Sequence, residues 1–132
     1  MALYMLDAGT CVAILKRTEV LKRLSVLPVK DVCISAITHS ELMFGLAMSR
    51  REAQDRAMLD LFLKHVAVLE YPRGAAEHYG EIRMALELLD AMVGANDLLV
   101  AAHARCLGLT LVTGQHRKLG KVPGLGVECW TS

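Results

Sequence analysis

The 132-residue sequence lacks the features that mark several common classes of protein. No apolar stretch reaches the length of a membrane span, and no basic segment followed by an apolar one opens the chain. We therefore expect a protein without a membrane anchor or a secretion signal. The formal net charge is only +1, so overall charge cannot hold nucleic acid strongly. Any contact with nucleic acid must come from a local basic patch.

The cysteines do not form a metal-binding or disulfide pattern. None of the four belongs to a C-x-x-C pair, and their neighbours are largely apolar, as in Val32-Cys33-Ile34. A zinc site and a disulfide framework are therefore both disfavoured. We expect buried, reduced thiols in a cytosolic (cytoplasmic) protein. The residues concerned are Cys11, Cys33, Cys106 and Cys129.

Several catalytic signatures are also missing. The sequence has no G-x-S-x-G nucleophile turn, no phosphate-binding Walker A loop and no G-x-G-x-x-G loop. Asp7 follows the first apolar run, as in phosphatases of the haloacid dehalogenase type. Those enzymes need a second acid two residues later, where this chain has Gly9. A phosphatase is therefore disfavoured.

The remaining composition is that of one packed globular domain over residues 1–132. Hydrophobic residues make up 54% and charged residues 22%, with no linker or internal repeat. Short apolar runs alternate with longer helical segments, which predicts an α/β fold with a twisted parallel sheet flanked by helices. We expect strands at 3–6, 32–35, 66–69, 109–113 and 127–130, and a loop at 114–126. We expect helices at 11–24, 38–48, 51–65, 74–89 and 96–107.

Three carboxylates follow or open these elements in a pattern typical of a metal site. Asp7 closes the first strand, Glu41 lies just after the second, and Asp97 starts a helix. Ligands of an open parallel sheet bind beyond the carboxyl ends of its strands. Acids that meet there from three elements would form an oxygen-rich pocket suited to Mg²⁺ or Mn²⁺.

Each acid also has a structural explanation when it is considered alone. Thr38 and Glu41 fit a capping box, Asn96 fits an N-cap with Asp97 in the first turn, and Asp7 could cap the turn after its strand. The three together are harder to explain in this way, because neighbouring carboxylates repel one another unless a cation compensates them.

Two further features have both a structural and a functional interpretation. The helix at 38–48 is too apolar on all sides for an ordinary surface helix, so we expect it to be part core and part wall of a groove. The groove should lie around Leu42–Met48 and Met58–Phe62. His103 lies among alanines, and we expect a satisfied core residue rather than a metal ligand.

Several segments resemble one known family. The chain is similar to PIN-domain proteins, specifically the VapC toxins of VapBC toxin–antitoxin systems. The resemblance runs nearly end to end and is most specific in Gly94-Ala95-Asn96-Asp97-Leu98-Leu99-Val100-Ala101-Ala102-His103-Ala104. The other matching segments are Tyr4-Met5-Leu6-Asp7, Ile34-Ser35 through Gly45, 76–83, 109–113 and Val122-Pro123-Gly124-Leu125 with Trp130.

The resemblance implies a PIN fold and an endoribonuclease that uses Mg²⁺ or Mn²⁺ to cut structured RNA, often tRNA or rRNA. It also implies a homodimer and a VapB-like antitoxin that blocks the active-site groove. Asp7, Glu41 and Asp97 match the first three acids of the family and are the expected catalytic residues. Asp7 and Asp97 are the expected metal ligands.

The chain departs from the family at two places. The first aspartate of the family is usually followed by Thr-Asn, where this chain has Ala8-Gly9. Lys118 stands where the fourth acid is expected, which changes the local charge by about two units and should weaken metal binding. If the loop after Thr113 folds over the pocket, the Lys118 ammonium should lie near the three carboxylates. The alternative function is thus a catalytically weakened PIN domain that mainly binds antitoxin or RNA.

Overall fold

We describe the protein from a computed structural model, which covers residues 2–16 and 29–131. Strands and helices alternate along most of the chain. The elements are β1 (Tyr4–Leu6), α1 (Ala8–Lys16), the 3-10 helix η1 (Val29–Asp31), β2 (Val32–Ser35), α3 (Ala36–Ala47), α4 (Glu52–Leu63), β3 (Ala67–Leu69), α5 (Ala75–Leu88), α6 (Ala95–Leu107), β4 (Thr110–Val112), α7 (His116–Leu119) and β5 (Val127–Glu128).

The strands form one parallel sheet of five, in the order β3-β2-β1-β4-β5. This confirms the expected α/β class. In the central strand β1, Met5 pairs with Cys33 on one side and with Leu111 on the other. The carboxyl ends of β2, β1 and β4 therefore lie next to one another.

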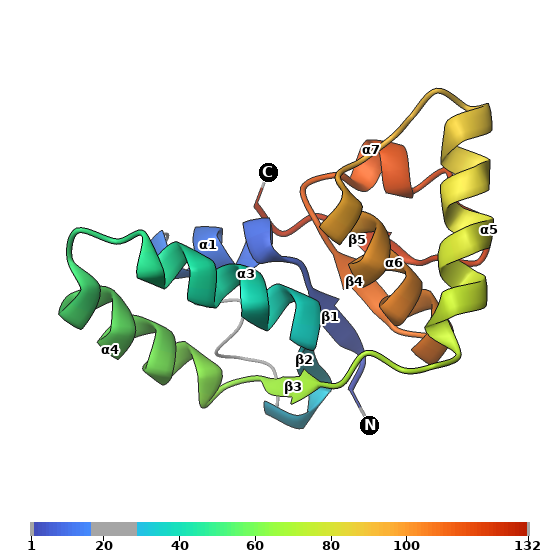
Figure 1. The fold of residues 1–132 in the computed structure, drawn as a ribbon. Helices are drawn as coiled ribbons and strands as arrows, with labels where there is room; N and C mark the ends of the chain where they lie inside the picture. The colour runs from blue at the N-terminus through green and yellow to red at the C-terminus, as the bar shows by residue number, and fades with distance from the viewer. Residues whose placement is uncertain (1, 17–28, 132) are drawn as a thin grey trace.

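Helices cover both faces of the sheet. Successive residues of a strand point to opposite faces, so each face carries apolar side chains that a helix must cover. Met5, Cys33 and Leu111 pack in one buried cluster with apolar residues of α5 and α6. Leu6, on the other face, packs in a second cluster with residues of α1, α3 and α4. Figure 1 shows α1, α3 and α4 on one side of the sheet and α5, α6 and α7 on the other.

The helix starts differ from those expected, for local reasons. The helix expected at 11–24 begins at Ala8, and its part at 17–24 lies outside the described residues. The helix expected from Thr38 begins at Ala36, because the Ser35 hydroxyl accepts a hydrogen bond from the Ile37 amide at 3.1 Å. The capping box of Thr38 and Glu41 is therefore wrong.

Two other local expectations also need correction. The loop expected at 114–126 contains the short helix α7, and Gly94 rather than Asn96 is the N-cap of α6. The strands at 67–69 and 127–128 are shorter than expected.

The described part of the chain contains no disulfide, and no helix in it is long and apolar enough to cross a membrane. Cys11 and Cys33 are buried as expected, and burial raises the pKa of Cys33 to about 12. Cys106 and Cys129 are only partly buried.

Candidate active site

Asp7 is fixed at the carboxyl end of the central strand. Its backbone amide donates to the Val112 carbonyl of β4 at 3.0 Å, which continues the pairing of the sheet by one residue. Its Oδ1 atom accepts a hydrogen bond from the Thr10 amide at 2.8 Å, so the side chain also caps α1 as expected. Asp7 is only 6% exposed, and its carboxylate is therefore held in one place at the edge of the sheet.

Glu41 lies in α3 and is influenced by both of the other acids. Burial raises the pKa of Glu41, and the charges of Asp97 and Asp7 raise it further. A hydrogen bond from the Asn96 side chain acts in the opposite direction and lowers the pKa. Glu41 thus meets the first turn of α6 directly.

Asp97 lies in that first turn and is half-buried. Burial raises the pKa of Asp97, and the charge of Asp7 adds to the effect, whereas a backbone hydrogen bond from Gly94 lowers it. A Cβ atom added at Gly94 would lie 3.3 Å from Asp97 Oδ2, so a larger residue there would crowd the carboxylate.

The structure therefore brings the carboxylates of Asp7, Glu41 and Asp97 within electrostatic range of one another. Carboxylate oxygens are the donors that Mg²⁺ and Mn²⁺ prefer, so the residues fit a divalent cation in donor type and charge. In the described residues, however, no three His, Cys, Asp or Glu side chains are closed into a ready metal-binding cluster.

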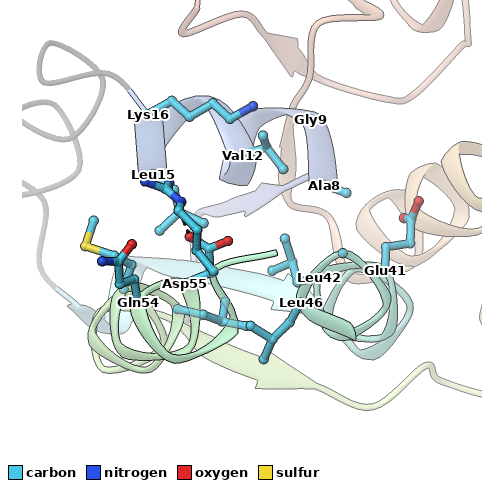
Figure 2. A pocket seen from close by; sticks show the side chains of 14 residues that line it. Ala8, Gly9, Val12, Leu15, Lys16, Glu41, Leu42, Leu46, Gln54 and Asp55 are labelled. Atoms are coloured by element: carbon cyan, nitrogen blue, oxygen red, sulfur yellow. Dashed lines mark ion pairs between the residues drawn. The ribbon is translucent and has the colours of Figure 1, made fainter. Parts of the chain in front are cut away.

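A groove of about 910 Å³ runs from Glu41 between α1, α3 and α4. Figure 2 shows Ala8 and Glu41 at one end and Gln54 and Asp55 at the other. The far end is polar, since Asp55 pairs with Arg51 at 3.7 Å and accepts a hydrogen bond from Ser49. The middle is mostly apolar. Its lining includes Val12, Leu15, Leu42, Leu46, Met58 and Leu59.

Sequence comparison places the chain in a known family. A profile of the PIN domain matches residues 4–124. Ribonuclease VapC2 of Rickettsia felis is 34% identical over 131 residues, which cover 97% of this chain and 98% of the relative. The chain belongs to the VapC ribonuclease toxins of the PIN domain family. The tRNA(fMet)-specific endonuclease VapC of Salmonella typhimurium is also 34% identical, over 96% of this chain and 97% of its own.

Solved VapC structures share the whole fold. A chain of VapBC2 from Rickettsia felis, bound to a promoter DNA fragment, matches with a TM-score of 0.88 and 31% identity, and the match covers 97% of this chain and 98% of that one. A chain of DNA-bound VapBC from Salmonella typhimurium gives a TM-score of 0.88 and 33% identity over 98% of this chain and 99% of its own.

Lys118 has a different partner from the one expected from the VapC resemblance. Its ammonium donates to the Met92 carbonyl at 3.1 Å, in the segment that leads into α6. It is not among the causes of the raised pKa of Glu41 or Asp97. The expected neutralisation of the acids by Lys118 is therefore not seen.

Three cations gather on and beside α7 of this VapC chain. Arg117, Lys118 and Lys121 are exposed, and no ion pair joins them to a carboxylate of the described residues. Figure 1 shows α7 next to the start of α6, which carries Asp97. A basic segment thus lies beside the helix turn that carries Asp97, although the chain as a whole is nearly neutral.

Sequence reasoning missed two contacts that involve neighbouring elements. Asn96 was expected to cap a helix, but its side chain faces Glu41 and lowers the pKa of that carboxyl. His103 is fully buried as expected, but it is only half satisfied. Its Nδ1 lies 2.8 Å from Ser35 Oγ, whereas its Nε2 has no partner among the described residues. The polar residue within an alanine-rich helix was the only signal for the second contact.

Proposed function

We propose that this chain is a metal-dependent endoribonuclease toxin whose catalytic acids are Asp7, Glu41 and Asp97. Asp7 and Asp97 would bind Mg²⁺ or Mn²⁺. The observation that carries the proposal is the placement of three carboxylates from β1, α3 and α6 near one another, since the charges of Asp97 and Asp7 raise the pKa of Glu41 and the charge of Asp7 raises the pKa of Asp97. Family membership supplies the reaction class, hydrolysis of RNA phosphodiester bonds.

The protein's own groups would divide the work of hydrolysis. Thr10 holds the Asp7 carboxylate in a fixed orientation, and Asn96 holds Glu41. The raised pKa of Glu41 suits a group that accepts and returns a proton during hydrolysis. When bound, a divalent cation would polarise the phosphoryl oxygen and lower the pKa of a bound water.

The RNA backbone would lie between the acids and the basic segment on α7. Phosphates attract exposed Lys and Arg side chains, and Arg117, Lys118 and Lys121 offer three such groups. A tRNA or rRNA is the proposed substrate class. The name of the Salmonella typhimurium relative, a tRNA(fMet)-specific endonuclease, supports the tRNA option.

A VapB-like antitoxin would occupy the groove between α1, α3 and α4 and block access to Glu41. The apolar middle and the polar ends of the groove suit an amphipathic segment. The related structures from Rickettsia felis and Salmonella typhimurium are VapBC assemblies, which supports such a partner. A homodimer, implied by the family resemblance, remains a prediction.

A weakened enzyme that mainly binds antitoxin or RNA is the second candidate. Ala8 and Gly9 line the mouth of the groove with little polar surface. A Cβ atom at Gly9 would lie 3.8 Å from Asp7 Oδ1, so a polar side chain there could support that carboxylate, and Gly9 cannot. Lys118 adds a positive charge where the family has an acid.

One assay separates the two candidates. Purified protein is incubated with total RNA in Mg²⁺, in Mn²⁺ or in EDTA. We expect cleavage with either metal and none in EDTA. A protein that binds RNA stably but does not cleave it under any of these conditions would instead favour the weakened domain.

A further inference from the structure

We infer that Ser35 and His103 are positioning residues, whose hydrogen bond holds α3 and α6 together so that Glu41 stays close to the proposed metal ligand Asp97. The inference rests on the proposed function, which it deepens. Neither residue was expected to have this role, and neither is a metal ligand in the proposal.

Ser35 fixes where α3 begins. It is the last residue of β2, it is fully buried, and its hydroxyl caps the helix by accepting from the Ile37 amide at 3.1 Å. The strand sets the position of the hydroxyl, and the cap sets the start of the helix. Glu41 follows Ser35 by six residues and lies in α3.

His103 provides the matching anchor on α6. It is fully buried, and its Nδ1 lies 2.8 Å from Ser35 Oγ. The Ser35 oxygen already accepts from Ile37, so its own proton can be donated to Nδ1 of a neutral ring. Burial lowers the pKa of His103, which favours this neutral form.

The bond opposes a repulsion that is present at the site. Asp97 precedes His103 by six residues, so the bond lies about 9 Å along each helix from the acid that the helix carries. Glu41 and Asp97 carry like charges when both are ionised, and α3 packs against α6, so the two carboxylates repel each other across this contact.

His103 lowers the stability of the fold, so packing alone does not explain why a histidine stands at this position. Its Nε2 is buried without a partner among the described residues, and an unpaired buried polar atom destabilises a fold. Its neighbours in α6, including Ala102 and Ala104, are small and fully buried. An apolar side chain would fill the space without that loss, but it would not reach Ser35 as a hydrogen-bond partner.

The test compares substitutions that keep or remove the bond. His103→Leu removes it, whereas the amide of His103→Asn can replace Nδ1. Tyr71→Leu is the packing control, because the Tyr71 and His103 rings pack edge to face with their centres 5.5 Å apart, and Tyr71 is not a partner in the bond between His103 and Ser35. Mn²⁺ affinity is measured by calorimetry on each full-length variant, and RNA cleavage is measured in parallel.

We expect His103→Leu to weaken Mn²⁺ binding about tenfold and to lower kcat, with an unchanged KM for RNA. His103→Asn and Tyr71→Leu should bind Mn²⁺ nearly as the wild type does. If His103→Leu binds Mn²⁺ like the wild type, or if Tyr71→Leu loses as much affinity, the positioning role is overturned. If His103→Leu does not fold, His103→Gln replaces it, since its amide reaches toward the Nε2 position; equal Mn²⁺ affinity of the Asn and Gln variants would then overturn the role.

A metal-free measurement separates this inference from the proposed function. The side-chain amide of Asn96, beside Asp97 in the first turn of α6, reports on how α6 sits against Glu41 in nitrogen-15 spectra without any metal. The Asn96 amide signals should shift in His103→Leu, which lacks the bond to Ser35, and should stay in place in His103→Asn. Failure of the wild type to bind Mn²⁺ would overturn the metal site alone, whereas unshifted Asn96 signals would overturn the positioning role.

Discussion

Asp97 lies both in the first turn of α6 and beside the carboxylate of Asp7. Asp97→Asn should lower RNA cleavage at a fixed Mn²⁺ concentration by about 10–100-fold, because a ligand charge is lost. The substitution removes a favourable charge at the N-terminus of the helix, which costs about 0.3–1 kcal/mol of stability. It also removes the repulsion between Asp97 and Asp7. We therefore expect a small change in stability beside a large change in rate.

A matched control exists for this substitution. Glu77 also lies in the first turn of a helix, α5, and it is exposed. Glu77→Gln should change thermal stability by a similar amount and leave the cleavage rate intact. Equal cleavage by Asp97→Asn and the wild type would exclude a catalytic role for Asp97.

Lys118 is the residue at which this chain departs most in charge from its family. Lys118→Glu removes the hydrogen bond to Met92 and places a carboxylate near the start of α6. We expect tighter Mn²⁺ binding in calorimetry without RNA, and faster cleavage at saturating RNA, because the negative charge attracts the cation. The KM for RNA should rise, since one cation of the basic segment is lost.

Arg117→Glu is the control for Lys118→Glu, since Arg117 is the neighbouring exposed cation. It makes the same charge change without affecting Met92. A similar rise in Mn²⁺ affinity in both variants would mean that only overall charge matters. No rise in either would mean that Lys118 has no effect on the metal site.

At the scale of elements, the groove between α1, α3 and α4 has a simple test. Met58 lines the groove and is 47% exposed, so Met58→Asp should fold and weaken a co-purified antitoxin complex by at least about tenfold. Phe62, which was expected in the groove, is only 3% exposed and belongs to the core. Phe62→Asp would therefore unfold the protein rather than report on binding.

Met84 is the control for the groove substitution. It is 62% exposed on α5, and it is not among the residues that line the groove. Met84→Asp should leave the antitoxin complex intact. If Met58→Asp binds antitoxin as tightly as Met84→Asp does, the antitoxin segment occupies another surface.

The elements themselves could largely be predicted from the sequence, but their ends could not. Alternation of short apolar runs and helical segments predicts a parallel sheet because both faces of such a sheet are buried. The start of α3 depends instead on one hydroxyl. Ser35 and Thr38 are both good caps, and only the position of Ser35 at the end of β2 decides between them.

At the scale of the whole molecule, the acids link stability to pH. Burial and neighbouring charge raise the pKa of Glu41 above its ordinary value of 4.5, so the folded apo protein holds this proton more tightly than the unfolded chain does. The resulting stabilisation of the folded protein is fully present when the pH is below the ordinary pKa of Glu41. This stabilisation is lost as the pH rises through the raised pKa of Glu41 in the folded protein.

The variant Glu41→Gln tests this dependence. At about pH 7 the variant should be more stable to urea than the metal-free wild type, because the amide carries no charge. The difference should shrink at about pH 5, where more of Glu41 is protonated. A difference that stays constant with pH would show that the carboxylates do not interact in the folded state.

The three acids could be predicted from the sequence because each follows from one element: the end of a strand, or the first two turns of a helix. The contacts that hold them could not, because they depend on how two helices face each other. Ser35 and His103 are 68 residues apart, and no local pattern indicates which atoms will meet across such a separation.

The pairing of β1 with β4 has a consequence for protein synthesis. Asp7 and Thr10 both bond to the Val112 carbonyl, and the bond from Thr10 spans 102 residues. Parallel strands cannot zip up from a hairpin, and a growing chain folds from its first residues onward. The strand β1 therefore lacks its neighbour β4 on one side until the ribosome has made residues 110–112. A chain translated only as far as α6 therefore lacks the Val112 carbonyl that fixes Asp7 and Thr10 at the edge of the sheet.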